Sequence, residues 1–215
     1  MSDKINVMIV EDQAMPRQLF ETIVRSEPKL NLVVSVDNAD VADICCDRYK
    51  VDLVLMDVVT KNGASGLLAA EKIKAFDKNV KIIIVTSMPE CSYVSRAEKI
   101  GVEGFWYKDF GKVPLISVIN DVLDGKRVYP EDSPEVSLGL SKGSDFTDRE
   151  LEVLREMTGG FTNSEIAEKM GISEKRVRNL VADMLEKTGF RNRTELAVRA
   201  REAGIVILER KEGDI

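Results

Sequence analysis

The sequence predicts two domains of different class, a doubly wound α/β domain over residues 1–125 and a small all-α domain over residues 146–215. In the first part, five short apolar segments alternate with five amphipathic ones. In the second part, four amphipathic segments follow one another with no strand-like run between them. The segment 126–145 is rich in Pro, Gly and Ser, which is typical of a linker.

Five strands are expected in the α/β domain, at Ile5–Val10, Leu30–Val36, Asp52–Asp57, Lys81–Thr86 and Gly104–Tyr107. These runs of Val, Ile and Leu lack polar alternation, which indicates strands buried on both faces of a parallel sheet. Helices are expected between and after them, at Ala14–Ser26, Ala39–Tyr49, Leu67–Phe76, Pro89–Ile100 and Lys112–Leu123. Right-handed crossovers and the flavodoxin-like strand order 2-1-3-4-5 complete the predicted topology.

Composition excludes several classes of function. An apolar fraction of 44% suits a soluble globular protein, and no apolar run reaches the roughly 18 residues of a membrane span. There is no His, which removes Ser-His-Asp, Cys-His and His-metal chemistry. Three Cys form neither a zinc spacing nor a disulfide framework, so a reducing cytoplasm is the expected location.

Charge is unevenly distributed along the chain. The net charge of −6 by itself argues against nucleic acid, yet residues 169–201 hold nine basic and four acidic side chains. An acidic first domain and a locally basic second domain indicate that the two have different partners.

Helix starts are well marked in the second domain. Thr147 with Glu150, and Thr162 with Glu165, have the spacing of capping boxes. Ser173 is expected to cap a long helix that ends near Thr188, and a last helix opens at residues 192–195.

Acidic side chains gather at the ends of the predicted strands. Glu11 and Asp12 follow the first strand and Asp57 ends the third, and the carboxyl ends of neighbouring parallel strands meet at one edge of a sheet. Packed carboxylates repel unless a cation intervenes, and oxygen ligands favour a hard divalent ion such as Mg²⁺. Thr86 and Lys108 follow the fourth and fifth strands and are able to bind a phosphoryl group, with Asp57 as its nucleophilic acceptor. Taken alone, Asp57 is more often a loop residue or a helix cap; the functional role is favoured because five residues of suitable chemistry lie at the ends of four strands.

These positions resemble those of the receiver domain of bacterial two-component response regulators. The resemblance implies that Asp57 accepts a phosphoryl group from a sensor histidine kinase. It also implies that Glu11, Asp12, Asp57 and the backbone carbonyl of Val59 hold Mg²⁺. Thr86 and Phe105 occupy the switch positions of the family; plain core packing is the alternative role for Phe105.

The loop after Asp57 departs from the family pattern. The family often has Met-Pro three and four residues after the acceptor, whereas residues 58–66 contain no Pro and reach Gly66 one residue late. We expect a more mobile loop, in which Lys61 adds a nearby cation.

The predicted long helix of the second domain has one apolar face, and its other face carries basic and amide side chains. Val177, Val181, Met184 and Leu185 form one stripe. Such a helix suits a DNA major groove, although a solvated charged face is the alternative.

The segments 146–154, 163–167, 173–177 and 191–195 closely resemble the LuxR-type helix-turn-helix. With the receiver, they give the pattern of a response regulator of the NarL/FixJ type, which implies a double-stranded DNA operator and a homodimer when active. The resemblance makes Glu174–Thr188 the recognition helix and the last helix a dimer contact. Base contacts are expected from Arg178, Asn179, Ala182 and Asp183, and phosphate contacts from Lys175, Arg176, Lys187 and Arg193.

Two other functions compete with a phosphorylation-controlled transcription factor. A phosphohydrolase with an aspartyl nucleophile would resemble the haloacid dehalogenases, which place a second Asp two residues after the nucleophile; that position is Val59 here. We therefore expect no enzyme beyond slow self-dephosphorylation. The third possibility is a DNA-binding protein whose receiver serves only for dimerisation.

Overall fold

The computed structural model describes residues 4–90, 92–109, 113–131 and 134–207. It contains two compact units, an α/β unit built from most of residues 4–131 and a helical unit built mainly from residues 134–207. In the described part of the chain, no helix is both long enough and apolar enough to cross a membrane.

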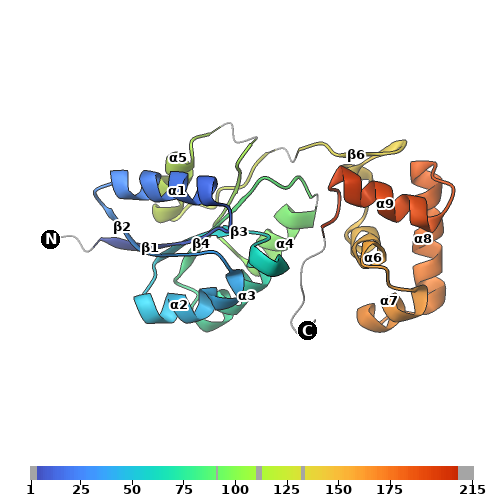
Figure 1. Ribbon diagram of the computed structural model, residues 1–215, viewed down its shortest axis with the longest axis horizontal. Coiled ribbons are helices and arrows are strands. Elements are labelled where there is room, and N and C mark those ends of the chain that lie inside the picture. The colour runs from blue at the N-terminus through green and yellow to red at the C-terminus, as the bar shows by residue number, and fades with distance from the viewer. Residues whose placement is uncertain (1–3, 91, 110–112, 132–133, 208–215) are drawn as a thin grey trace. The chain divides into compact units, whose positions relative to one another are not determined.

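The α/β unit contains one parallel sheet in the predicted order β2-β1-β3-β4-β5 (Figure 1). The strands are β1 (Ile5–Val10), β2 (Leu30–Val36), β3 (Leu53–Asp57), β4 (Lys81–Thr86) and β5 (Gly104–Tyr107). All five residues of β3 are buried, as expected for a central strand with both faces covered. The predicted fold class is confirmed.

Helices cover both faces of this sheet (Figure 1). They are α1 (Ala14–Ser26), α2 (Ala42–Tyr49), α3 (Gly66–Phe76), α4 (Ser92–Ile100) and α5 (Leu115–Leu123), with short 3-10 turns at Ala39–Val41 and Lys61–Gly63. Apolar side chains of α1 and α5, such as Phe20 and Ile119, pack on one face with Ile9, Leu55 and Ile83. A rigid sheet with both faces covered leaves only its edges and its strand ends open to ligands.

Three predicted helix starts differ from the structure by three residues, and α3 starts at Gly66, one residue earlier than expected. The expected helix at 39–49 begins as a 3-10 turn, and α4 starts at Ser92 rather than at residue 89. Helix α5 starts at Leu115, directly after Pro114, whose extended backbone (φ −59°, ψ 140°) places it before the first turn. The expected start at residue 112 lies outside the described residues.

The outer edge of β5 is covered by the chain that follows α5. Val128 pairs in parallel with Gly104. The amide of Phe105 donates to the carbonyl of Val128 at 2.8 Å, and the amide of Val128 donates to Glu103 at 2.9 Å. The hydroxyl of Tyr129 donates to the carbonyl of Val102 at 2.7 Å. The first residues of the predicted linker thus extend the sheet.

The helical unit has the four predicted helices, α6 (Asp148–Thr158), α7 (Asn163–Met170), α8 (Glu174–Thr188) and α9 (Arg193–Ala203). Both predicted capping boxes are present, at Thr147 and at Thr162. Ser173 caps α8 by accepting from the amide of Arg176. These caps satisfy amides that a helix start would otherwise leave without a partner, so the helix starts were readable from the sequence.

Part of the predicted linker belongs to the helical unit. Residues Ser137–Leu138 and Ser141–Lys142 form a two-stranded hairpin, β6–β7, and Val136 and Leu138 are buried in the helical core. The hairpin covers the end of α8, because the amide of Leu140 donates to Thr188 at 3.0 Å. The described linker between the two units is therefore shorter than residues 126–145.

Candidate functional site

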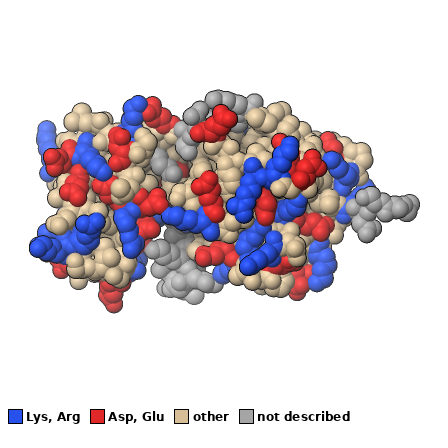
Figure 2. Space-filling model, turned by 180° about the vertical axis from the view of Figure 1, so that it is seen from behind, with Lys and Arg blue, Asp and Glu red and all other residues tan. Residues whose placement is uncertain are grey.

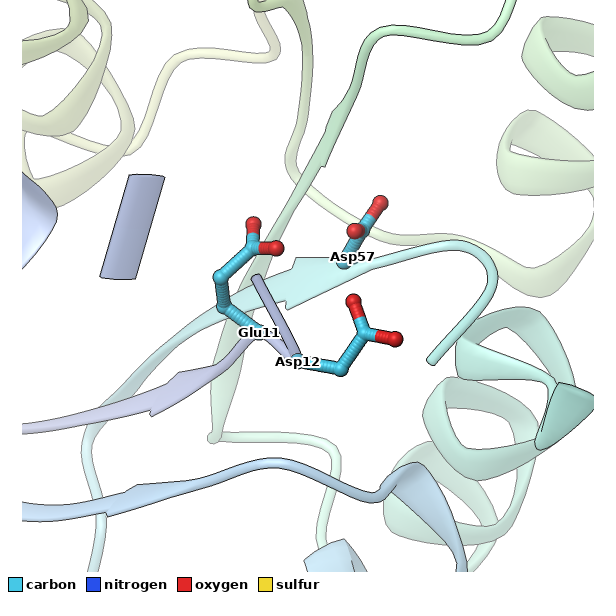
Figure 3. Close-up of side chains that lie close together, drawn as sticks. All are labelled: Glu11, Asp12 and Asp57. Atoms are coloured by element: carbon cyan, nitrogen blue, oxygen red, sulfur yellow. The ribbon is translucent and has the colours of Figure 1, made fainter. Parts of the chain in front are cut away.

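Three carboxylates meet at the carboxyl ends of β1 and β3. One oxygen each of Glu11, Asp12 and Asp57 lies within 4.8 Å of the others (Figure 3). The pairing of Val10 with Met56 brings the two strand ends side by side. Glu11 is fully buried and Asp57 is 5% exposed, while Asp12 is the most exposed of the three. The predicted acidic pocket is thus assembled by the sheet.

Lys108 places its ammonium between two of these carboxylates. Its Nζ lies 2.5 Å from Glu11 Oε2 and 2.9 Å from Asp57 Oδ2. Its backbone amide donates to the carbonyl of Thr86 at 2.8 Å, which ties the residue after β5 to the buried last residue of β4. The ends of β1 and β3 and the residue after β5 therefore supply the side chains of this cluster, and the end of β4 is joined to it through the backbone of Lys108.

Burial dominates the electrostatics of the pocket. It raises the pKa of Asp57 from 3.8 to about 7, with Lys108 opposing the rise and the charge of Glu11 adding to it. Burial lowers the pKa of Lys108, but the adjacent Asp57 and Glu11 outweigh this effect and the pKa is raised. A divalent cation among these carboxylates would favour the ionised form of Asp57 and so lower its pKa.

The donor set fits a hard divalent cation. Glu11, Asp12 and Asp57 offer only carboxylate oxygens, and Val59, the remaining predicted ligand, is partly buried two residues after Asp57. Mg²⁺ is commonly held by one or two carboxylates with several retained waters, so the small number of protein ligands suits it.

The loop after Asp57 is tied down on both sides. The amide of Val58 donates to Asp57 Oδ1 at 2.8 Å, and the amide of Gly66 donates to the carbonyl of Val58 at 2.7 Å. Val59 and Ser65 form an antiparallel bridge. These bonds join the two arms of the loop; its greater mobility, expected from the absence of Pro, stays a prediction.

Gly66 stands where no side chain fits. A Cβ at this position would lie 1.8 Å from the carbonyl oxygen of Asp57 and 3.0 Å from the side chain of Met56. The first turn of α3 therefore approaches the end of β3 at backbone contact, which only glycine allows.

Phe105 is buried within β5. It is 2% exposed and packs edge-on against Tyr107, with ring centroids 5.0 Å apart. This ring contact is part of the core packing of the unit. Phe105 also lies three residues before Lys108 in the sequence.

A helix-turn-helix occupies α7 and α8. Gly171 ends α7 in the left-handed conformation (φ 63°), which makes the tight turn to Ser173. In α8, Val177, Leu180, Val181 and Met184 are buried against the helical core. The other face of α8 is exposed and carries most of the predicted DNA contacts: Lys175, Arg176, Arg178, Asn179, Ala182 and Asp183.

Charges on the exposed surface are mixed in sign. On the face seen in Figure 2, Lys and Arg lie among Asp and Glu rather than in one large basic field. Arg178 itself pairs with Glu174 at 3.0 Å, one helical turn away. An exposed pair of this kind contributes only about 0.3–0.5 kcal/mol, so Arg178 is easily released to another partner.

Two predicted phosphate contacts have partners inside the helical unit. Lys187 Nζ lies 2.8 Å from both carboxylate oxygens of Glu150 and 3.0 Å from the carbonyl of Asp145. Arg193 donates to Asn163 Oδ1 at 2.9 Å and to the carbonyl of Phe161 at 2.8 Å. Both side chains connect segments of the helical unit. Sequence spacing did not indicate this role, because the partners lie about 30 residues or more away along the chain.

Lys187→Met should destabilise the helical unit by about 1–3 kcal/mol, because the buried Glu150 loses its charged partner. Burial raises the pKa of Glu150, but Lys187 and Thr147 outweigh it and the pKa lies below 4.5. The stability that this provides is present above pH 4.5 and is lost as the pH falls through the lowered pKa. Hydrogen exchange of α6–α8 amides in the full chain measures both effects.

The control for this experiment is Lys175→Met, since Lys175 is exposed on α8. It should leave exchange unchanged at every pH. Equal protection in Lys187→Met and the control would show that the pair with Glu150 contributes nothing to stability.

Comparisons with known proteins agree with this geometry. Residues 7–120 match the response regulator receiver domain, and residues 144–200 match the luxR family of bacterial regulatory proteins. Over 201 residues the chain is 35% identical to the transcriptional regulatory protein DesR of Bacillus subtilis, covering 93% of this chain and 98% of that protein. It is 26% identical over 197 residues to the fimbriae Z protein of Escherichia coli K12, covering 89% of this chain and 93% of that one.

The fold is shared with solved structures. RcsB from Salmonella enterica serovar Typhimurium, bound to promoter rprA in the presence of phosphomimetic BeF3⁻, gives a TM-score of 0.61 at 18% identity, covering 93% of this chain and 99% of that one. The molecule is thus a transcription regulator with a receiver domain and a helix-turn-helix. The chain belongs to the response regulators of two-component systems, with a LuxR-type DNA-binding domain.

Proposed function

We propose that Asp57 is the phosphoacceptor and that a sensor histidine kinase supplies the phosphoryl group. The observation that carries this proposal is the position of Asp57, buried at the end of β3 and bonded to Lys108 beside two further carboxylates. One carboxylate oxygen attacks phosphorus, the P–N bond of the kinase phosphohistidine breaks, and that histidine takes up a proton. An ionised carboxylate is the attacking species.

Other pocket residues have distinct roles in this proposal. Glu11, Asp12, Asp57 and the carbonyl of Val59 would hold Mg²⁺, which when bound would neutralise negative charge around the phosphoryl group. Lys108 is placed to pair with a phosphoryl oxygen, and its ammonium is already oriented by Glu11.

Thr86 and Phe105 are the proposed switch residues. Phosphorylation adds roughly one to two negative charges and strong acceptor oxygens at Asp57. Thr86 and Lys108 are joined through a backbone bond, so a movement of either toward the phosphoryl group moves the ends of β4 and β5 together. Phe105 then changes its packing within β5, which biases the surface of α4, β5 and α5.

The output is DNA binding by the second domain, in the cytoplasm, on a double-stranded operator. We propose domains over residues 1–125 and 146–215, with the segment through Tyr129 added to the first because Val128 pairs with β5, and hairpin β6–β7 added to the second because it packs on the helical core. Arg178, Asn179, Ala182 and Asp183 would face bases, with Lys175 and Arg176 near phosphates. Two copies would join through α9, where Val198 is half exposed, and read paired half-sites.

Phosphorylation of the full chain should change its operator affinity or its oligomeric size. A coupling free energy of typical size between two sites changes the binding affinity about 5- to 150-fold. DNA duplexes selected by the protein from a random pool, titrated with and without acyl phosphate treatment, give the affinity; light scattering gives the size. If both stay unchanged at full phosphorylation, the receiver serves only for dimerisation.

Arg178→Ala should relax the preference at one base position in each half-site. A bidentate contact from Arg to guanine contributes about 1–3 kcal/mol of discrimination. Lys175→Ala is the matched control on the same exposed face: it should weaken selected and scrambled duplexes alike and reduce the salt slope by about one unit. Equal losses on both duplexes for Arg178→Ala would assign base reading to Asn179 and Asp183 instead.

A further inference from the structure

Thr60 is a buried hydroxyl in the loop that follows Asp57. Its side chain is 2% exposed, although the residue lies between the partly exposed Val59 and the exposed Lys61. Thr60 Oγ1 accepts from the amide of Ala39 at 2.9 Å and donates to the carbonyl of Ala64 at 3.1 Å. Both hydrogen-bonding functions of the hydroxyl are therefore used, and its partners lie on two different segments.

One partner closes the loop on itself. The backbone amide of Thr60 also donates to Ala64, at 3.0 Å, and the amide of Gly63 donates to the carbonyl of Thr60 at 2.9 Å. The turn between them places Asn62 and Gly63 in the left-handed region, at φ 62° and 74°. A non-glycine residue at positive φ is held there only by its surroundings, and the bonds of Thr60 provide them.

The other partner joins the loop to the chain beside Glu11. Ala39 follows β2 closely, and the last residue of β2, Val36, accepts from the amide of Glu11 at 2.9 Å. Thr60 thus connects the loop after Asp57 to the segment that neighbours the first two carboxylates. Hydrogen bonds within the protein therefore connect the segment that contains Val59 to the segment that contains Glu11.

Two further links run beside the first. The amide of Lys61 donates to the carbonyl of Asp37 at 3.1 Å. Lys61 pairs with Asp37 at 2.7 Å, and both side chains are about half exposed, at 58% and 45%. Exposed pairs of this kind contribute little and are screened by salt. The side-chain bonds of Thr60 are buried, whereas the side-chain pair of Lys61 is exposed. Substitution of Lys61 is therefore a matched control for substitution of Thr60.

We propose that Thr60 is a positioning residue of the phosphoryl-transfer pocket: its hydroxyl fixes the backbone next to Val59, whose carbonyl would be one of the oxygens around the divalent cation. The inference rests on the proposed function, because Val59 is a ligand only in that proposal. Thr60 touches neither the cation nor the phosphoryl group; it acts by fixing the backbone next to the ligand.

The test compares Thr60→Val, which keeps the shape and removes the hydroxyl, with Thr60→Ser, which keeps the hydroxyl. The rate of labelling by acetyl phosphate is measured against Mg²⁺ concentration in the full chain. Thr60→Val should raise the half-saturating Mg²⁺ about 10- to 100-fold, the usual effect of removing a residue that supports a metal ligand. The rate at saturating Mg²⁺ should stay close to that of the natural protein, and Thr60→Ser should restore the natural Mg²⁺ dependence.

Lys61→Met removes the exposed pair with Asp37 and should leave the Mg²⁺ dependence unchanged. An unchanged half-saturating Mg²⁺ in Thr60→Val would overturn the inference while leaving Asp57 as the acceptor. So would equal shifts in Thr60→Val and Thr60→Ser. Absence of labelling in the natural protein at every Mg²⁺ concentration would instead overturn the proposed function itself.

A second measurement covers the case in which Thr60→Val does not fold. In the natural protein, hydrogen exchange of the Ala39 amide reports directly on its bond to Thr60. Because cation and hydroxyl stabilise the same loop conformation, Mg²⁺ should slow this exchange. Exchange of the Ala39 amide that is the same with and without Mg²⁺ would overturn the inference.

Discussion

Asp57→Asn should abolish labelling by acetyl phosphate, because an amide supplies no nucleophilic oxygen anion. The fold should survive. Burial and Glu11 raise the pKa of Asp57 to about 7, so the ionised carboxylate is unfavourable in the cation-free pocket even with Lys108 beside it. At pH 8 and without divalent cation, the Asn variant should therefore unfold at a temperature no lower than that of the natural protein.

The same pKa fixes the pH dependence of stability. The folded protein keeps the Asp57 proton between pH 3.8 and about 7, where the unfolded chain has lost it. The contribution of this group to the free energy of unfolding thus falls as the pH rises through that window, and it is constant above it. In Asp57→Asn this component should be missing from the pH profile of thermal unfolding.

Intact mass is the readout for labelling, and Asp52→Asn is the matched control. Asp52 is exposed just before β3 and accepts from the amide of Asn6, which the oxygen of an amide side chain also permits. The control should gain one phosphoryl group like the natural protein, and excess chelator should prevent labelling of both. Labelling of Asp57→Asn at the natural rate would exclude Asp57 as the acceptor.

Gly66→Ala should impair both folding and phosphorylation. Alanine favours a helix over glycine by about 1 kcal/mol, so the substitution would be stabilising at an open position. Here the new methyl group would lie 1.8 Å from the carbonyl oxygen of Asp57, and backbone must move. Overpacking of this kind costs about 1–3 kcal/mol, and a displacement of about 1 Å at a reacting group costs about 100-fold in rate.

Gly104→Ala serves as the comparison for this variant. Its Cβ would meet only side chains, of Ile83 and Val122, at 3.1–3.3 Å, and these are able to shift slightly. We expect a smaller loss of stability and an unchanged labelling rate at saturating Mg²⁺. Equal labelling rates in Gly66→Ala and Gly104→Ala would show that the close approach of α3 has no bearing on Asp57.

Sequence alone predicted the sheet and the pocket because both depend on strong local signals. Continuous runs such as Lys81–Thr86 are readable as buried strands, and parallel strands bring their carboxyl ends together whatever the loops do. The acidic cluster then follows from Glu11, Asp12 and Asp57 ending their strands. The helix starts at Thr147 and Thr162 were equally readable, since a capping box is contained in four residues.

Features that depend on distant partners were not predictable in this way. Hairpin β6–β7 has two-residue strands with Gly and Ser between and around them, a composition that also suits a linker; only its packing on the helical core distinguishes the two. Lys187 and Arg193 have the chemistry of phosphate contacts, and their pairing with Glu150 and Asn163 arises from tertiary structure. Thr60 gave no sequence signal, because a Thr in a loop is ordinarily exposed.

The pairing of Val128 with β5 determines where this chain can be divided into fragments. A fragment ending at residue 125 would leave the amide of Phe105 without its partner and turn β5 into an open edge. Open edges recruit strands from other molecules, so such a fragment is prone to self-association that the full chain avoids. A fragment that continues through Tyr129 keeps the edge of β5 covered. A change in the oligomeric state of this fragment then reports on phosphorylation and not on an edge exposed by truncation.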